Sequence, residues 1–447
     1  MKSKSDFIRL FPSDYVEFEK ALREPSPVSI RLNSGKVSID DLASRFVCTE
    51  KVPWCNSGYY LAERPAFTLD PLFHAGAYYV QEAASMFVER CFERVRSFGQ
   101  LRTALDLCAA PGGKSTHLAS LLCGEALLVA NETIRSRLGS LRENMSKWGK
   151  PNVIVTNSDP KEFKQLGDFF DFVLVDAPCS GEGMFRKEAE ALKQWSIDLV
   201  KHCAARQRRI VSEVWEALRP GGFMLYSTCT YNLLENEETA SLIVNELGAE
   251  TVSVDVSDCR NIESSEYQGI RGYRFFPHKT RSEGFFACLM RKSGEKTDAT
   301  SRGIKRKIPK KEYDLSKWFG TKYKLMFTEI GGRIRAYPRE FAGEIEILEQ
   351  RLRTVSSGIE VAELKGQSPA PNIDAILCDD FNAAAFAELE TDLETALRYL
   401  RRETIIAPAG TPQGFVVLTY GGIAFGLVKN LGSRCNNLLP PARRIQF

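Results

Sequence analysis

Two cysteines each follow an apolar run that is typical of a buried strand. Cys179 lies in VDAPCSG (175–181), and Cys229 lies in YSTCT (226–230). A thiolate at the carboxyl end of a strand is a candidate nucleophile. Two such thiols suggest a reaction in which one sulfur forms a covalent bond and the other helps to break it. A single buried cysteine would more often be a small packing residue, but the glycine loop upstream favours chemistry.

That loop follows the apolar run at 101–107, which predicts a buried strand, and a helical pattern continues through Leu121. A strand, a glycine turn and a helix are how α/β folds hold a nucleotide-like cofactor at a helix N-terminus. A phosphate-binding loop needs glycine where this chain has Cys108, and the GxGxxG pattern is also absent, so an ATPase is excluded on spacing. The loop consists of Cys108, Ala109, Ala110, Pro111, Gly112, Gly113 and Lys114.

Four further apolar runs, at 126–130, 152–156, 170–176 and 222–226, predict four more strands. Glu132 follows the first of them, 19 residues after Gly113, where doubly wound folds commonly place a carboxylate on a ribose. Asp159 follows the second, Asp176 ends the third, and Cys229 follows the fourth. Each carboxylate alone could simply cap a helix or turn. Polar or thiol groups at five successive strand ends predict a site along one sheet edge.

These segments resemble the RNA cytosine-5 methyltransferases of the RsmB/NOP/NSUN family, and within it the bacterial RsmF-type branch. The resemblance is carried by Cys108–Lys114, by DAPCSGEG (176–183) and by STCT (227–230). The segments PVSIRLN (27–33), GAYYVQ (76–81) and GMFRK (183–187) also resemble that branch. The family's amino-group methylating relatives carry a Pro-Pro-aromatic sequence in place of Ala177, Pro178 and Cys179.

The resemblance implies an α/β fold with a Rossmann-like class I S-adenosylmethionine-dependent methyltransferase core. It also implies an N-terminal RNA-binding extension and C-terminal α+β and PUA-like β-barrel domains. Residues 108–114 would hold S-adenosylmethionine, Glu132 its ribose and Asp159 its adenine. Asp176 would border the cofactor and the target base, Cys229 would be the nucleophile, and Cys179 would serve product release.

The chemistry explains why two thiols are needed. Carbon 5 of cytosine is a poor nucleophile, and a thiolate that adds to carbon 6 makes carbon 5 able to take a methyl group. Asp176 could relieve charge near N3 only if it is partly protonated, which requires burial or a negative neighbour. The target cytosine must be single-stranded or flipped out of its helix.

Bulk properties describe a cytoplasmic protein of several domains. The chain has 447 residues, 26% of them charged, and a net charge of +3. There is no apolar run of the roughly 18 residues a membrane span requires, and no signal-peptide core. Twelve cysteines without a CxxC pair suggest free thiols in a reducing compartment and no metal site. We expect a monomer.

The expected domains are an N-terminal substrate-binding extension (1–65), the catalytic domain (66–292), a basic linker (293–311), a small α+β domain (312–395) and a PUA-like RNA-binding domain (396–447). In the linker, Arg302, Lys305, Arg306, Lys307, Lys310 and Lys311 suit a hinge slightly better than an RNA-gripping strap. Residues 415–419 and 423–428 predict a hairpin of the last domain.

The leading interpretation is cytosine-5 methylation of small-subunit (16S) ribosomal RNA, free or in an assembly intermediate. The same chemistry on transfer RNA and a non-catalytic ribosome assembly factor remain alternatives. The two cysteines disfavour the assembly factor, which needs neither thiol. DNA cytosine methylation is disfavoured because those enzymes place their nucleophile in a Pro-Cys-Gln motif and have no counterpart of Cys229.

Overall fold

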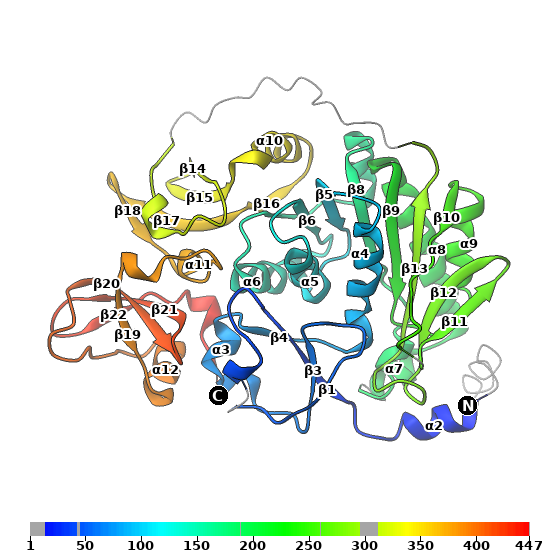
Figure 1. The fold of residues 1–447 in the computed structure, drawn as a ribbon, viewed down its shortest axis with the longest axis horizontal. Coiled ribbons are helices and arrows are strands. Elements are labelled where there is room, and N and C mark those ends of the chain that lie inside the picture. Colours follow the sequence, from blue (N-terminus) through cyan, green and yellow to red (C-terminus); the bar gives the residue numbers. More distant parts are fainter. Residues whose placement is uncertain (1–13, 43–44, 188, 260, 296–311, 447) are drawn as a thin grey trace.

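The computed structural model describes residues 14–42, 45–187, 189–259, 261–295 and 312–446. Its centre is a ten-stranded mixed sheet (Figure 1). Five parallel neighbours in the order β9-β8-β5-β6-β7 form its middle. They are β5 (Thr103–Asp106), β6 (Leu127–Asn131), β7 (Val153–Thr156), β8 (Phe170–Asp176) and β9 (Leu218–Thr228). The five predicted strands are confirmed, and the last one begins earlier and runs longer than expected.

The chain is wound outward from β5 in both directions, so the strand order reverses beside β5. Ligands of open α/β sheets bind outside the carboxyl ends of the strands at such a switch point. Antiparallel strands extend the sheet beyond β9 in the order β13-β12-β11, and β10 pairs with β13. Their bounds are β10 (Ala249–Thr251), β11 (Glu263–Tyr267), β12 (Ile270–Phe275) and β13 (Phe285–Lys292).

Helices cover both faces of the sheet, which explains why its strands read as continuous apolar runs. In β8, Phe172 and Leu174 join one buried cluster, while Val173 and Val175 join another. The first cluster includes α4 (Val88–Arg96), α5 (Gly113–Leu121) and α6 (Leu138–Trp148). The second includes α8 (Ile197–Val214), α9 (Glu237–Asn245) and α10 (Ala342–Arg351), and the short α7 spans Ala189–Gln194.

The N-terminal unit is a four-stranded sheet in the order β2-β3-β1-β4, preceded by α2 (Tyr15–Ala21). It consists of β1 (Val28–Leu32), β2 (Cys48–Lys51), β3 (Gly58–Leu61) and β4 (Tyr78–Val80), and α3 (Pro71–His74) precedes β4. Because β1 pairs with both β3 and β4, this sheet extends beyond the expected boundary at residue 65.

The region after the linker is built onto the catalytic sheet. Its own sheet contains β14 (Leu325–Ile330), β15 (Arg333–Pro338), β17 (Ile359–Lys365) and β18 (Ser368–Pro371). The intervening β16 (Thr354–Ser357) instead pairs antiparallel with β7, so Thr354 lies opposite Thr156. This pairing covers a strand edge that would otherwise be open. The small domain is therefore continuous with the catalytic sheet.

The last unit is a sheet in the order β19-β20-β21-β22 that packs against α12 (Leu393–Leu400). Its strands are β19 (Ala387–Glu390), β20 (Gly414–Tyr420), β21 (Ile423–Asn430) and β22 (Cys435–Asn437), and α11 (Ile373–Ile376) precedes them. The predicted hairpin is confirmed as β20 and β21. Because β19 pairs parallel with β20, the sheet begins before residue 396.

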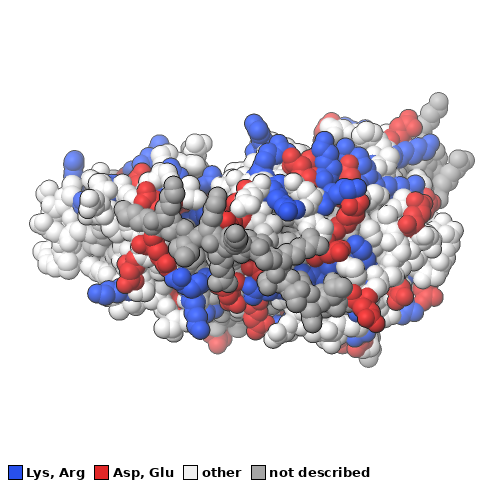
Figure 2. Space-filling view, turned by 90° about the horizontal axis from the view of Figure 1, so that it is seen from above, with Lys and Arg blue, Asp and Glu red and all other residues white. Residues whose placement is uncertain are grey.

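The six basic residues of the expected linker lie outside the described residues. On the face shown in Figure 2, Lys and Arg side chains are interspersed with Asp and Glu, in keeping with a net charge of only +3. Among the described helices, none is both long and apolar enough to cross a membrane.

Candidate active site

The glycine loop connects the end of β5 to the start of α5. Gly112 adopts a left-handed conformation (φ +117°), which favours glycine. Neighbouring segments hold the loop: Ala109 N donates to Asn131 O (2.8 Å), and Asn144 Nδ2 donates to Pro111 O (2.8 Å). The first amide groups of a helix have no acceptor within the helix. The loop therefore presents donors at the switch point, as a nucleotide-like cofactor requires.

Asp106, the last residue of β5, lies beneath this loop and was not singled out from the sequence. Its Oδ2 accepts a hydrogen bond from Ser115 Oγ (2.6 Å), and its Oδ1 is buried without a partner. Burial raises the pKa of Asp106 to about 7. Asp106 lies inside the apolar run that predicted the strand, but nothing local in the sequence distinguished its carboxyl group from a strand-end cap.

Glu132 lies just past β6 and is 3% exposed. Its Oε1 accepts from Ile134 N (2.8 Å), while Arg137 Nη1 lies 3.2 Å from Oε2. Oε2 is buried and the geometry of that ion pair does not give it a hydrogen bond. Arg137 also donates to Ala110 O in the glycine loop. A buried acceptor beside the loop fits the ribose hydroxyls of S-adenosylmethionine.

Asp159 lies half-buried after β7, at the N-cap of a short 3-10 helix, η5 (Pro160–Leu166). Its Oδ1 accepts from Lys161 N (3.2 Å), and Glu162 completes a capping box. The capping role that the sequence left open is thus present. A contact with adenine remains a prediction.

Asp176 connects the glycine loop to the strand that carries Cys229. Lys114 Nζ lies 2.8 Å from Asp176 Oδ2, and Ser227 Oγ donates to Asp176 Oδ1 (2.8 Å). Burial lowers the pKa of Lys114, but the ion pair with Asp176 outweighs this and raises it above the usual value. Both oxygens of Asp176 are engaged by donors from the two neighbouring segments.

The two cysteines meet at the carboxyl ends of β8 and β9. Cys179 Sγ and Cys229 Sγ lie 3.1 Å apart, and both residues are half-buried free thiols. The hydrogen bond with Cys229 and burial raise the pKa of Cys179 well above its usual value. Cys179 therefore keeps its proton and can donate its S–H to Cys229. The structure brings together the two sulfurs that the sequence singled out.

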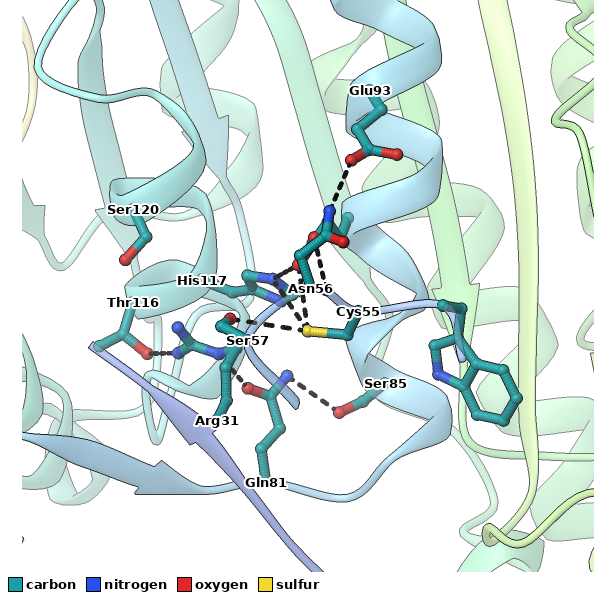
Figure 3. Close-up of polar contacts among 12 residues, drawn as sticks. Arg31, Cys55, Asn56, Ser57, Gln81, Ser85, Glu93, Thr116, His117 and Ser120 are labelled. Atoms are coloured by element: carbon teal, nitrogen blue, oxygen red, sulfur yellow. Dashed lines mark hydrogen bonds and ion pairs between the residues drawn. The ribbon is translucent and has the colours of Figure 1, made fainter. Parts of the chain in front are cut away.

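Arg31 connects the N-terminal unit to the cofactor helix (Figure 3). The buried guanidinium donates to Thr116 Oγ1 (2.6 Å) and Gly113 O (3.3 Å) in α5, and to Gln81 Oε1 (2.8 Å). It also stacks on Trp148, 4.4 Å from the ring centroid. The sequence marked the segments containing Arg31 and Gln81, but only the fold shows that they meet the glycine loop.

Next to Arg31, Cys55, Glu89 and His117 form a buried polar cluster with metal-ligating atoms. Glu89 Oε2 lies 3.0 Å from Cys55 Sγ and 2.9 Å from His117 Nε2. Burial raises the pKa of Cys55 to about 12 and lowers that of His117 to about 4. These contacts join Cys55 to Glu89 in α4 and to His117 in α5, so the cluster links the two helices.

The doubly wound sheet, its glycine loop and the carboxylate after the second strand define a class I S-adenosylmethionine-dependent methyltransferase. Three family models match the chain: 16S rRNA methyltransferase RsmB/F over residues 99–291, the N-terminal domain of 16S rRNA methyltransferase RsmF over 4–83, and the methyltransferase RsmF PUA domain over 386–445. The chain belongs to the RsmB/F family of 16S ribosomal RNA methyltransferases.

Individual relatives agree with this assignment. The chain is 31% identical to ribosomal RNA small subunit methyltransferase F of Erwinia tasmaniensis, an alignment covering 96% of this chain and 92% of the relative. The Aeromonas hydrophila protein of the same name is 31% identical, with 95% and 92% covered.

Among solved structures, a methyltransferase homologue from Pyrococcus horikoshii is 29% identical, with a TM-score of 0.54 and coverage of 64% of this chain and 93% of the other. NSun6 from Pyrococcus horikoshii with SFG shares the fold at 21% identity, a TM-score of 0.54 and coverage of 65% and 97%. Because the chain belongs to this family of methyltransferases, S-adenosylmethionine is its cofactor.

Proposed function

We propose that this protein methylates carbon 5 of a cytosine in small-subunit ribosomal RNA, with Cys229 as the covalent nucleophile. The observation that carries the proposal is the 3.1 Å separation of the Cys179 and Cys229 sulfurs, beside a cofactor loop tied to the same edge by Lys114 and Asp176. The names of the relatives support ribosomal RNA of the small subunit as the substrate.

In the proposed reaction, Cys229 Sγ attacks carbon 6 of the cytosine, and Cys179 donates a hydrogen bond to that sulfur beforehand. S-adenosylmethionine would supply the methyl group: its S–CH3 bond would break as carbon 5 takes the methyl, and S-adenosylhomocysteine would be left. The proton on carbon 5 leaves to a water that Cys179 orients. The electron pair of that C–H bond restores the ring double bond, and the C6–S bond breaks to return the Cys229 thiolate.

The other predicted residues bind and orient. The 108–114 loop and Glu132 would hold the cofactor, with Asp159 toward its adenine. Asp176 lies between the cofactor loop and the strand leading to Cys229, where it can contact both cofactor and base. The proposal includes a monomeric cytoplasmic enzyme that acts on the subunit or an assembly intermediate, and on a cytosine withdrawn from any helix.

The test compares Cys229→Ser with Cys179→Ser on small-subunit ribosomal RNA. Cys229→Ser should abolish methyl transfer, because the nucleophile is missing. Cys179→Ser should accumulate a covalent RNA–protein adduct that survives denaturing electrophoresis, since release is impaired. Turnover by Cys229→Ser, or adduct formation by that variant, would contradict the assignment of Cys229 as the nucleophile. Parallel reactions with transfer RNA separate the alternative substrate, and wild-type protein without transferase activity would indicate an assembly factor.

A further inference from the structure

A buried carboxylate in the loop that contains Cys179 (residues 177–183) accepts hydrogen bonds from the segment that follows Cys229. We call these two segments the cysteine loops. Glu182, in the short 3-10 helix η6 (Glu182–Met184), is 0% exposed. Its two oxygens accept five hydrogen bonds. The donors are Thr230 Oγ1, Tyr231 N (2.6 Å), Asn232 N (3.1 Å), Asn232 Nδ2 (2.9 Å) and Trp195 Nε1 (3.0 Å). Three of the five come from residues 230–232 through the same oxygen, Oε2.

A second buried carboxylate makes the reciprocal connection. Glu235 follows Cys229 in the chain, is 0% exposed, and accepts from Ser180 N (2.9 Å), the residue after Cys179. Gln207 Nε2 (2.7 Å) and Asn232 Nδ2 (2.8 Å) donate to its two oxygens as well. Each cysteine loop therefore supplies a carboxylate that accepts a main-chain N–H from the other loop.

The backbones of the two loops also touch directly. Gly183 N donates to Cys229 O (2.8 Å), and a Cβ at position 183 would lie 2.8 Å from that oxygen. Glycine is thus required here by close approach. The contact fixes the carbonyl of the nucleophile's own residue against the Cys179 loop.

These carboxylates are costly to bury. In the part of the chain that the structure describes, neither Glu182 nor Glu235 has an ion pair with Lys or Arg, and burial raises the pKa of Glu235. Buried charges without a counter-ion are unfavourable for stability, and apolar side chains of similar size would serve a core as well or better. Each carboxylate instead accepts several hydrogen bonds at once, and these bonds fix the positions of the two cysteine loops.

We propose that Glu182 and Glu235 are positioning residues that set the separation and orientation of the Cys179 and Cys229 sulfurs. The proposal rests on the proposed function, because a fixed sulfur pair matters only if both thiols act on one cytosine. Displacement of a reacting group by about 1 Å can cost roughly 10²-fold in rate. Two loops that meet at a 3.1 Å contact have little room for such a shift.

The first experiment measures the sulfur geometry without substrate. In a glutathione redox buffer, glutathione disulfide is reduced to two glutathione thiols as Cys179 and Cys229 each lose a proton and join. Peptide mass spectrometry of the full-length protein gives the effective concentration of this pair. Glu182→Gln and Glu235→Gln should lower this effective concentration by about 10²-fold. The amide NH2 of Gln is a donor, and it would face N–H and O–H groups that now donate to the carboxylate.

Glu89→Gln is the matched control. Glu89 is also buried (3% exposed), but its carboxylate contacts Cys55, Asn56 and His117, and none of these residues lies in either cysteine loop. This variant should leave the effective concentration unchanged even if the protein is less stable. An equal fall in the control, or no fall in the two Gln variants, overturns the positioning role.

The second experiment separates positioning from the reaction itself. The Gln variants should lose kcat for cytosine methylation while the KM for S-adenosylmethionine stays the same. Thr230→Val, which removes one donor to Glu182 and keeps the shape, should shift both readouts in the same direction by less, and serves if a Gln variant does not fold. The proposal is contradicted if a variant has a lower effective concentration of the sulfur pair but an unchanged kcat. Wild-type protein that never methylates cytosine contradicts the proposed function instead.

Discussion

Lys114 Nζ lies 2.8 Å from Asp176 Oδ2, and this ion pair joins the cofactor loop to the strand end that precedes Cys179. The two residues are 16% and 31% exposed, so the contact is partly shielded from water. Because Ser227 donates to the other oxygen of Asp176, the carboxylate also contacts the strand leading to Cys229. One side chain thus links all three chain segments that the proposed reaction needs.

Replacing Lys114 with Met should therefore slow methylation without unfolding the protein. Loss of a charged hydrogen bond costs about 1.5–3 kcal/mol, which corresponds to roughly a 10- to 100-fold slower single turnover. The measurement is methyl transfer to small-subunit ribosomal RNA at saturating enzyme. Lys164→Met is the control, since its ion pair with Glu216 is exposed on both sides (65% and 56%) and contributes little. Equal rates for both variants would make the Lys114 pair dispensable.

Glu132→Ala should weaken S-adenosylmethionine binding by about 1–3 kcal/mol, the cost of hydrogen bonds left unmade. Glu132→Gln should weaken it less, because an amide oxygen can still accept from a ribose hydroxyl. Isothermal calorimetry measures both affinities directly. Glu125→Gln, which alters an exposed ion pair with Arg96, should bind like the wild type. An affinity unchanged by Glu132→Ala would remove this residue from the cofactor site.

The sequence was sufficient for elements whose signal is local. The five parallel strands were predicted because strands buried on both faces leave continuous apolar runs, such as 170–176. Their polar ends also predicted one shared edge, where the structure places Cys179 beside Cys229. The carboxyl ends of parallel strands lie at one edge of a sheet, so residues far apart in the chain could be predicted to lie close together there.

Contacts that depend on long-range packing were missed. Arg31 meets Gly113 and Thr116 through a sheet that only the folded N-terminal unit defines. Glu182 stood inside a quoted motif, yet nothing local distinguishes a buried acceptor of five hydrogen bonds from a solvated glutamate. The pairing of β16 with β7 was also invisible, since a short strand of TVSS carries no sign of its partner.

Charge on the C-terminal sheet should contribute to RNA binding. Lys429 and Arg434 are exposed near the β21–β22 turn, within the segment that matches the PUA model. The double substitution Lys429→Gln/Arg434→Gln should weaken RNA binding and make log Kd against log salt shallower by up to about two. The control is Arg96→Gln/Lys164→Gln, whose residues pair with Glu125 and Glu216 at the amino end of the sheet. Identical slopes for the two doubles would make the C-terminal sheet structural.

Two buried groups near the cofactor loop should tilt the pH dependence of stability in opposite directions. Burial lowers the pKa of His117 to about 4, so between about pH 4 and its usual value of 6.5 only the unfolded chain binds the proton. Stability from this residue is complete above pH 6.5 and is lost as the pH falls. Burial raises the pKa of Asp106 from 3.8 to about 7, so its contribution is complete below pH 3.8 and is lost as the pH rises.

Urea unfolding at pH 5 and pH 7 separates the two contributions. Each amounts to about 2 kcal/mol over this interval, and the two have opposite signs. Burial also lowers the pKa of His74 to about 4, so His74 adds a rising contribution in the wild type and in both variants. Asp106→Asn keeps a neutral side chain and removes the falling contribution, so its unfolding free energy should increase from pH 5 to pH 7. His117→Gln removes one rising contribution, so its unfolding free energy should increase less, or decrease more, than that of the wild type over the same interval. Parallel pH profiles for the two variants would contradict both assignments, because neither residue would then change its protonation on unfolding.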